Sequence, residues 1–223
     1  MKNFTVLLTI ISFAYGAAFA QTGKKPKKEQ TAGKTENAVV SKNASPLEIA
    51  NAALKAHGGE KYKAMKTLVV RGTVDVSGSP TQVFPGTFAT IFSGEKYRLE
   101  INSFQSLKQT FDGTQTVSSI RGFELPPLNR LGLPLLAKIG EKDFTVSALL
   151  DASKRKTGFR ITAPEGFYTD FFVDEKTGQI KSYESSYEIG ERSVTTSIEI
   201  DKVREVDGVK IPNATRSGSR PDN

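Results

Sequence analysis

Few residues in this sequence have the types and spacing for acid–base or metal chemistry. His57 is the only histidine, and the 223-residue chain has no cysteine. A Ser-His-Asp triad would have to use His57, yet the sequence carries no nucleophile motif. We expect His57 to end a helix, where a partly charged imidazole suits the negative end of the helix dipole. Because one histidine without cysteine leaves no usual zinc ligand set, no metal site is predicted.

The carboxylates gather at predicted turns. Asp174 and Glu175 form one group, and Asp201, Glu205 and Asp207 form another; turns favour such residues for structural reasons. A paired acid–base site needs one carboxylate in an apolar pocket, and none of these has apolar sequence neighbours of that kind. No phosphate loop and no G-x-S-x-G elbow occur. We therefore predict no catalytic residue, no cofactor and no enzyme activity, and keep a hydrolase with an unrecognised site as an alternative.

The first twenty residues have the pattern of a cleavable secretory signal. Lys2 is followed by an uncharged apolar run over residues 4–13 and by Ala18-Phe19-Ala20, the small-x-small pattern that a signal peptidase cleaves. The run is too short for a membrane span, which takes roughly 20 apolar residues. We expect cleavage near Ala20 and export to the periplasm or the cell exterior, without a transmembrane segment in the mature form. A buried N-terminal helix or strand is the alternative.

Residues 21–45 hold most of the net positive charge. They contain six lysines against two glutamates, in a chain whose net charge is +7. We interpret them as a disordered linker. Lys24, Lys25, Lys27 and Lys28 are expected to make weak contacts with an anionic envelope surface. Because no aromatic residues interleave with the lysines, no nucleic-acid partner is predicted.

The elements begin with a helix after Ser45. Ser45, Pro46 and Glu48 form a capping box with proline at the first helical position, and Gly58-Gly59 ends the helix. A short helical piece is expected over residues 60–66. The face predicted to be buried comprises Leu47, Ile49, Ala50, Ala53, Leu54, His57, Tyr62 and Met65.

Alternating strands dominate the rest of the chain, joined by turns such as Asp112-Gly113 and Asp207-Gly208. Residues 122–140 are apolar but interrupted by prolines, so we expect short helical turns there. A further helix is predicted over 143–153 and a frayed tail over 217–223. The sum is an α+β fold in which a curved antiparallel sheet is covered by the N-terminal helix and the short helical insertion. The strands are expected over 67–76, 87–92, 97–101, 107–111, 116–120, 159–163, 167–173, 179–187, 193–204 and 209–216.

The chain has many large apolar residues for a sheet that so little predicted helix covers. The chain has 14 phenylalanines and a leucine-rich insertion. One interpretation is an ordinary filled core, and the other is a lipid-sized cavity under a loosely covered sheet. The candidate cavity residues are Phe88, Phe92, Leu99, Phe111, Leu131, Leu133, Leu135, Leu136, Ile139 and Phe171.

Four short motifs are spread over residues 46–216. They are residues 56–61 (AHGGEK) with 65–68 (MKTL) and Arg71-Gly72, then Phe111-Asp112-Gly113, then Phe172-Val173-Asp174 with Lys176-Thr177-Gly178, and finally residues 206–212 (VDGVKIP). In these motifs the chain is similar to periplasmic outer-membrane lipoprotein-sorting proteins, the LolA/LolB-like group. It departs from that group after Gly113, where residues 114–119 replace the usual aromatic residue, and in its added basic segment.

The resemblance implies an unclosed β-barrel, or half-barrel, whose cavity accepts acyl chains of lipoproteins or other lipophilic molecules. We accordingly expect a monomeric, non-enzymatic carrier or binding protein for a lipid or lipoprotein acyl chain. The alternative is a periplasmic interaction or scaffold protein that uses a sheet face or edge and has no ligand cavity.

Overall fold

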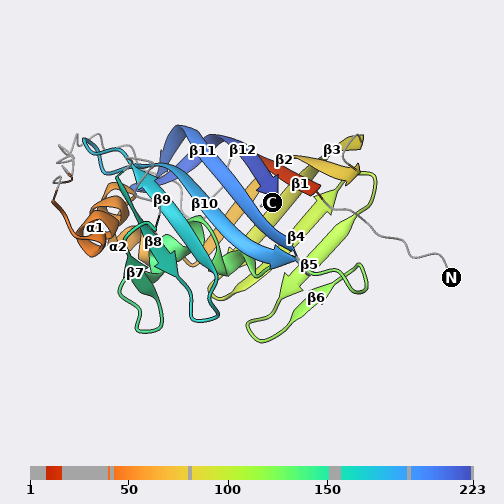
Figure 1. Cartoon of the computed structure of the whole chain (residues 1–223), viewed down its shortest axis with the longest axis horizontal. Coiled ribbons are helices and arrows are strands. Elements are labelled where there is room, and N and C mark those ends of the chain that lie inside the picture. The colour runs from red at the N-terminus through yellow and green to blue at the C-terminus, as the bar shows by residue number, and fades with distance from the viewer. Residues whose placement is uncertain are drawn as a thin grey trace.

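Two antiparallel sheets of six strands each follow one another along the chain (Figure 1). A computed structural model describes residues 9–16, 40, 43–79, 82–150, 157–189 and 192–221. Within each sheet every strand pairs with its neighbour in sequence, so both sheets are meanders. The predicted α+β class with a mainly antiparallel sheet is confirmed, but the strands divide into two sheets where one was expected.

The strands of the first sheet are β1 (Thr9–Gly16), β2 (Thr67–Ser79), β3 (Gln82–Ser93), β4 (Lys96–Asn102), β5 (Leu107–Phe111) and β6 (Thr116–Ser118). Those of the second are β7 (Thr145–Ser147), β8 (Gly158–Thr162), β9 (Tyr168–Val173), β10 (Ile180–Ile189), β11 (Arg192–Val206) and β12 (Val209–Pro221).

The hairpin turns follow the chemistry expected of their residues. At the end of β5 the Asp112 carboxylate accepts hydrogen bonds from the backbone N–H groups of Thr114 (2.8 Å) and Gln115 (3.0 Å). Between β11 and β12, Asp207 and Gly208 both have positive φ, 53° and 81°. Two consecutive positive φ values match the twist of a tight hairpin, which explains an Asp-Gly pair at this turn.

Helix α1 (Pro46–Ala56) begins at the predicted capping box. The Ser45 hydroxyl accepts from the Glu48 N–H at 3.3 Å, and the Glu48 carboxylate accepts from the Ser45 N–H at 2.7 Å. Ile49, Ala50, Ala53 and Leu54 are buried. Leu47, which we predicted to face inward, is 49% exposed, because it lies in the first turn outside the stripe that meets the second sheet. Helix α2 (Glu60–Lys63) is shorter than expected and buries Tyr62.

The proline-interrupted insertion forms two short 3-10 helices, as predicted. They are η1 (Leu128–Arg130) and η2 (Leu133–Lys138), and they lie between the end of the first sheet and the start of the second. The insertion contributes to two separate hydrophobic clusters. Leu125 packs with residues of the first sheet such as Leu99. Leu133, Leu135, Leu136 and Ile139 pack with α1 and the second sheet. The insertion therefore links the two halves of the core.

Two sequence predictions in the C-terminal half were wrong. Residues 143–150 contain no helix; they include β7, in which Val146 pairs with Ile161 of β8. Leu150, which lies within the predicted helix, is 81% exposed, and residues 151–153 of that helix lie outside the described residues. Cross-strand pairing with β8 overrides a helical pattern that was weak in this segment. The predicted tail also begins too early, since β12 continues to Pro221 by pairing with β11.

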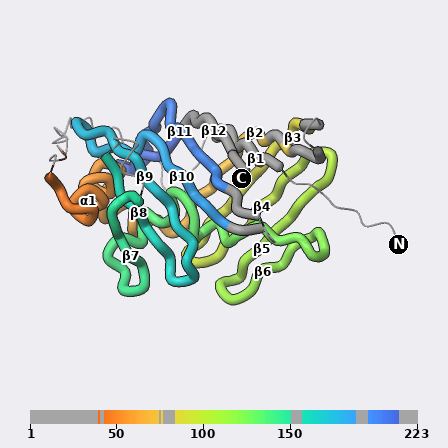
Figure 2. Tube along the Cα trace, in the orientation of Figure 1, coloured from red at the N-terminus to blue at the C-terminus, as the bar shows by residue number. Residues whose placement is uncertain are grey.

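The N-terminal region is described only in part. Thr9–Gly16, inside the predicted signal peptide, form β1, which pairs with β2 from Thr9↔Ser77 to Gly16↔Arg71 and lies beside β12 (Figure 1). At the opposite end of the molecule, α1 lies against β7 and β8 (Figure 2). Val40, within the predicted linker, is buried and donates its N–H to the Glu175 carbonyl at 3.0 Å. Lys24, Lys25, Lys27 and Lys28 lie outside the described residues. No helix in the described part of the chain is long and apolar enough to cross a membrane.

Candidate ligand-binding cavity

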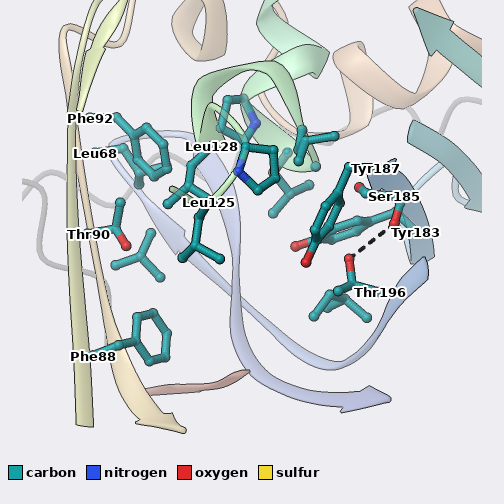
Figure 3. A pocket seen from close by; sticks show the side chains of 17 residues that line it. Leu68, Phe88, Thr90, Phe92, Leu125, Leu128, Tyr183, Ser185, Tyr187 and Thr196 are labelled. Atoms are coloured by element: carbon teal, nitrogen blue, oxygen red, sulfur yellow. Dashed lines mark hydrogen bonds between the residues drawn. The ribbon is translucent and has the colours of Figure 1, made fainter. Parts of the chain in front are cut away.

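An apolar cavity of about 120 Å³ lies between the two sheets, beneath the insertion (Figure 3). One wall comes from β2 and β3 and the other from β10 and β11, while the insertion closes one end. Dry cavities of about this size, on the order of 150 Å³, hold benzene or xenon. The lining residues are Leu68, Val70, Phe88, Thr90, Phe92, Leu125, Pro126, Leu128, Leu131, Gly132, Leu133, Pro134, Tyr183, Ser185, Tyr187, Thr196 and Ile198.

Hydroxyl groups supply the polar atoms of the side-chain lining. Those of Tyr183 and Tyr187 point from β10 into the cavity, opposite the aromatic rings of β3 (Figure 3). Burial raises the pKa of Tyr187 to about 12, so its hydroxyl stays neutral at physiological pH. The Thr196 hydroxyl donates to the Ser185 carbonyl at 3.3 Å. Among the described residues that line the cavity none is charged, so the site suits an uncharged, apolar guest.

Buried hydrogen bonds hold the insertion at Leu125 and at Gly132-Leu133. The Gln109 amide donates to the Leu125 carbonyl at 2.8 Å and accepts from the Leu125 N–H at 2.7 Å. Near the middle of the insertion the Gly132 N–H donates to the Thr169 hydroxyl at 2.8 Å, and the Tyr62 hydroxyl donates to the Leu133 carbonyl at 2.9 Å. Buried polar groups are costly unless paired. These bonds therefore satisfy polar backbone groups of the insertion and fix it above the cavity.

A second space of about 140 Å³ adjoins the first. Leu68, Phe92 and Pro134 border both spaces. This second space also has polar and charged residues on its wall, among them Glu95, Asn129 and Lys138. The apolar cavity thus adjoins a second, more polar space that borders the β3–β4 turn.

Glu95 in that turn ties both short helices of the insertion to the first sheet. Its carboxylate pairs with Arg130 of η1 at 2.7 Å and with Lys138 of η2. Burial opposes ionisation of Glu95, but hydrogen bonds and charges from Lys138 and Arg130 prevail and lower the pKa of its carboxyl. The Asn129 amide also donates to the Glu95 carbonyl at 2.9 Å. One turn thus anchors three residues of the insertion.

The residues predicted from the sequence for the cavity fall into three groups. Phe88, Phe92, Leu131 and Leu133 line it. Leu99 lies in the core of the first sheet, and Phe111 stacks on Tyr97 with ring centres 5.8 Å apart. The remaining residues belong to the core formed by α1, the insertion and the second sheet: Leu135, Leu136, Ile139 and Phe171.

Sequence reasoning missed the wall contributed by the second sheet. Tyr183, Tyr187 and Ile198 line the cavity from β10 and β11. Tyr183 and Tyr187 are four residues apart in one strand, so they share a face. That spacing was a signal that could have placed them together. Which face of β10 lies toward the first sheet depends on how the two sheets pack together, and the local sequence pattern does not predict that packing.

His57 has a structural role at the end of α1. Its Nδ1 lies 2.7 Å from the Lys210 carbonyl, and its Nε2 lies 3.1 Å from the Ile180 N–H. A carbonyl can only accept and an N–H can only donate, so Nδ1 carries the proton and the ring is neutral. Burial lowers the pKa of His57. The predicted helix-end position is confirmed, and the expected partial charge is corrected. The described residues contain no group of three histidine or carboxylate side chains placed to hold a metal ion.

No protein-family model, curated protein or solved structure matches this chain. The case for a function therefore rests on the cavity and on the residues that surround it.

Proposed function

We propose that this protein is a non-enzymatic binding or carrier protein for a lipophilic ligand, held in the cavity between the two sheets. The observation that supports it is a space of about 120 Å³ that the apolar side chains of three different segments surround but do not fill. The proposed ligand class is a lipid or a lipoprotein acyl chain, as in the LolA/LolB-like group. We further propose that the two sheets are the halves of an unclosed barrel and that the protein acts after export.

The energetics favour an alkyl chain as the guest. Each methylene moved from water into apolar surroundings contributes about 0.8 kcal/mol. The cavity requires no charge to be buried with the ligand, because none of the described lining residues is ionised at neutral pH. At its present size the cavity takes one segment of an alkyl chain. The rest of a long chain would extend toward the second space or the solvent.

The packing of the lining side chains also weighs against a pure scaffold protein. A protein that uses only a sheet face or edge gains stability by filling its interior, because voids forfeit packing contacts. Here Thr90 and Ser185 bring small polar side chains to opposite walls where larger apolar ones would close the space. The lining residues thus keep the space open.

Filling the cavity should weaken ligand binding without unfolding the protein. Val70 of β2 lines the cavity, and its neighbour Val69 pairs with the exposed Ile91 on the outer face of the same sheet. In Val70→Phe the added ring occupies the place of about two methylenes, so binding of a polarity-sensitive fluorescent acyl probe should weaken by about tenfold. Val69→Phe adds the same ring to the same strand and should leave uptake unchanged.

Three results decide the test. Weaker probe binding in Val70→Phe alone, at unchanged melting temperature, supports the proposal. Equal effects of the two substitutions would mean that the probe binds elsewhere. Wild-type protein that neither takes up the probe nor carries lipid in native mass spectra after purification would overturn the proposal.

A further inference from the structure

Asn129, at the centre of η1, has a buried amide with one unused acceptor. The residue is 4% exposed, and its Nδ2 donates to the Glu95 carbonyl at 2.9 Å. That bond fixes which way the amide points, because a carbonyl accepts only from the nitrogen. The Oδ1 atom has no hydrogen-bond partner among the described residues. A buried acceptor without a donor costs about 1–3 kcal/mol.

The unused acceptor belongs to a residue on the wall of the second space. Asn129 lines this space of about 140 Å³, and Leu68, Phe92 and Pro134 separate it from the apolar cavity. An alkyl chain that lies in the apolar cavity and passes these three side chains would therefore bring its polar end close to Asn129. The two adjoining spaces, one apolar and one polar, match the two parts of an amphiphile.

We propose that the ligand is an amphiphile whose head group lies in the second space and donates an O–H or N–H hydrogen bond to Asn129 Oδ1. This inference rests on the proposed function and names the ligand class for the same site. The charged side chains on the wall of the second space further limit which head groups fit. Lys63, Lys66 and Lys138 outnumber Glu95 and Glu141 on its wall. An alkylammonium head group is therefore disfavoured, and a hydroxyl or amide head group fits best.

A pair of ligands that differ by a single donor tests this inference. In 1-dodecanol and dodecyl methyl ether the alkyl chain and the oxygen are the same, but only the alcohol has an O–H. Each displaces a fluorescent acyl probe from the wild-type protein, and the ratio of their dissociation constants is measured. We expect the alcohol to bind about tenfold more tightly, because only the alcohol satisfies the buried acceptor. A ratio near one would overturn the inference.

The substitution Asn129→Leu assigns the preference to this side chain. Leucine has a similar volume and no acceptor, so the alcohol should lose its advantage and the ratio should fall to about one. Asn102→Leu replaces an exposed amide on β4 that lines neither space, and it should keep the wild-type ratio. Any general loosening of the variant affects both ligands and cancels in the ratio. A ratio that stays high in Asn129→Leu would show that another group, or a bound water, receives the donor.

The inference and the proposed function fail in different ways. If neither dodecyl compound displaces the probe and the probe itself does not bind, the proposed function is wrong. If both compounds bind equally well, the cavity holds a lipophilic ligand and only the role of Asn129 is wrong. If Asn129→Leu does not fold, the wild-type ratio alone still decides the inference.

Discussion

Both ring nitrogens of His57 bond to backbone groups from distant strands. Nδ1 donates to the carbonyl of Lys210 in β12, and Nε2 accepts from the N–H of Ile180 in β10. The Lys210 N–H in turn donates to the His57 carbonyl at 3.1 Å. One side chain at the end of α1 thus holds the helix to two strands of the second sheet. Its sequence position indicated a helix end, but the two strand partners could not be predicted, because they lie more than 120 residues away.

We expect His57→Leu to be strongly destabilising. The substitution leaves the buried Ile180 N–H and one acceptor position of the Lys210 carbonyl unpaired, which should lower the free energy of unfolding by about 2–5 kcal/mol. Urea unfolding measures this loss. Leu47→Ala changes an exposed residue of the same helix, and we expect it to stay within about 0.5 kcal/mol of the wild type. Similar losses in the two variants would show that His57 contributes only through the helix.

Protonation of the same ring should make stability depend on mild acid. The folded-state pKa of His57 is lowered by burial, whereas the unfolded chain titrates near about 6.5. The unfolded state therefore binds the proton first, and the stabilisation present above pH of about 6.5 is lost as the pH falls toward the folded-state pKa. Unfolding free energies measured between pH of about 5 and 7.5 should decrease toward acid in the wild type. The slope should be smaller in His57→Leu, and an equal slope would assign the effect to other groups.

The cavity residues show what side-chain patterns can and cannot reveal. Alternation in β3 placed Phe88 and Phe92 on one face, and both line the cavity. The leucines of the insertion were equally apolar, yet Leu135 and Leu136 lie in a filled core while Leu131 and Leu133 border the open space. Hydrophobicity predicts burial, but whether the opposite wall is filled depends on side chains from another sheet. Asn129 carried no signal at all, because a single asparagine in a turn is ordinary.

Elements with strong local chemistry were predictable, and those held by distant pairing were not. The capping box at Ser45 and Glu48 and the Asp-Gly turns satisfy backbone groups within a few residues, so the sequence alone locates them. The segment over β7 has no such local signal. It becomes a strand because β8 supplies the partner at Ile161. The same limit explains why the end of β12, which depends on β11, was placed too early.

The insertion is held by buried hydrogen bonds at Leu125, Gly132 and Leu133. More accessible ion pairs join its Arg130 and Lys138 to Glu95. Removing the Glu95 charge in Glu95→Gln should weaken the contacts with Arg130 and Lys138. Because the Glu95 side chain is 43% exposed, solvent screening limits the loss of unfolding free energy to about 1 kcal/mol or less. Amide hydrogen exchange over residues 128–138 should nevertheless accelerate, and the acyl probe should associate faster.

A matched variant tests whether the Glu95 contacts control ligand entry past the insertion or only stabilise the fold. Glu100→Gln removes a carboxylate that pairs with Arg98 on the surface of β4, away from the insertion. We expect it to leave both the exchange in the insertion and the association rate unchanged. If Glu95→Gln speeds exchange but not probe association, the insertion is a fixed cover and the ligand enters by another route.

At the scale of the whole molecule, β1 lies where the two sheets approach each other. It pairs with β2 on one side and lies beside β12 on the other. The sequence predicts that cleavage near Ala20 removes this strand. A chain that begins at Gln21 would then present the edge of β2 next to the edge of β12. Either the two edges pair and close a barrel, or β2 stays an open edge, as the proposed half-barrel requires.

Hydrogen exchange distinguishes these two outcomes. Alternate N–H groups of an antiparallel strand point to opposite neighbours, so only those of β2 that point away from β3 change partners when β1 is removed. For the unclosed barrel we expect these amides to be protected in the full chain and to exchange fast in the chain from Gln21 to Asn223. Amides of β4, which stays between β3 and β5, should be equally protected in both chains. Full protection of β2 in the shorter chain would mean that β12 has replaced β1, and it would exclude the half-barrel.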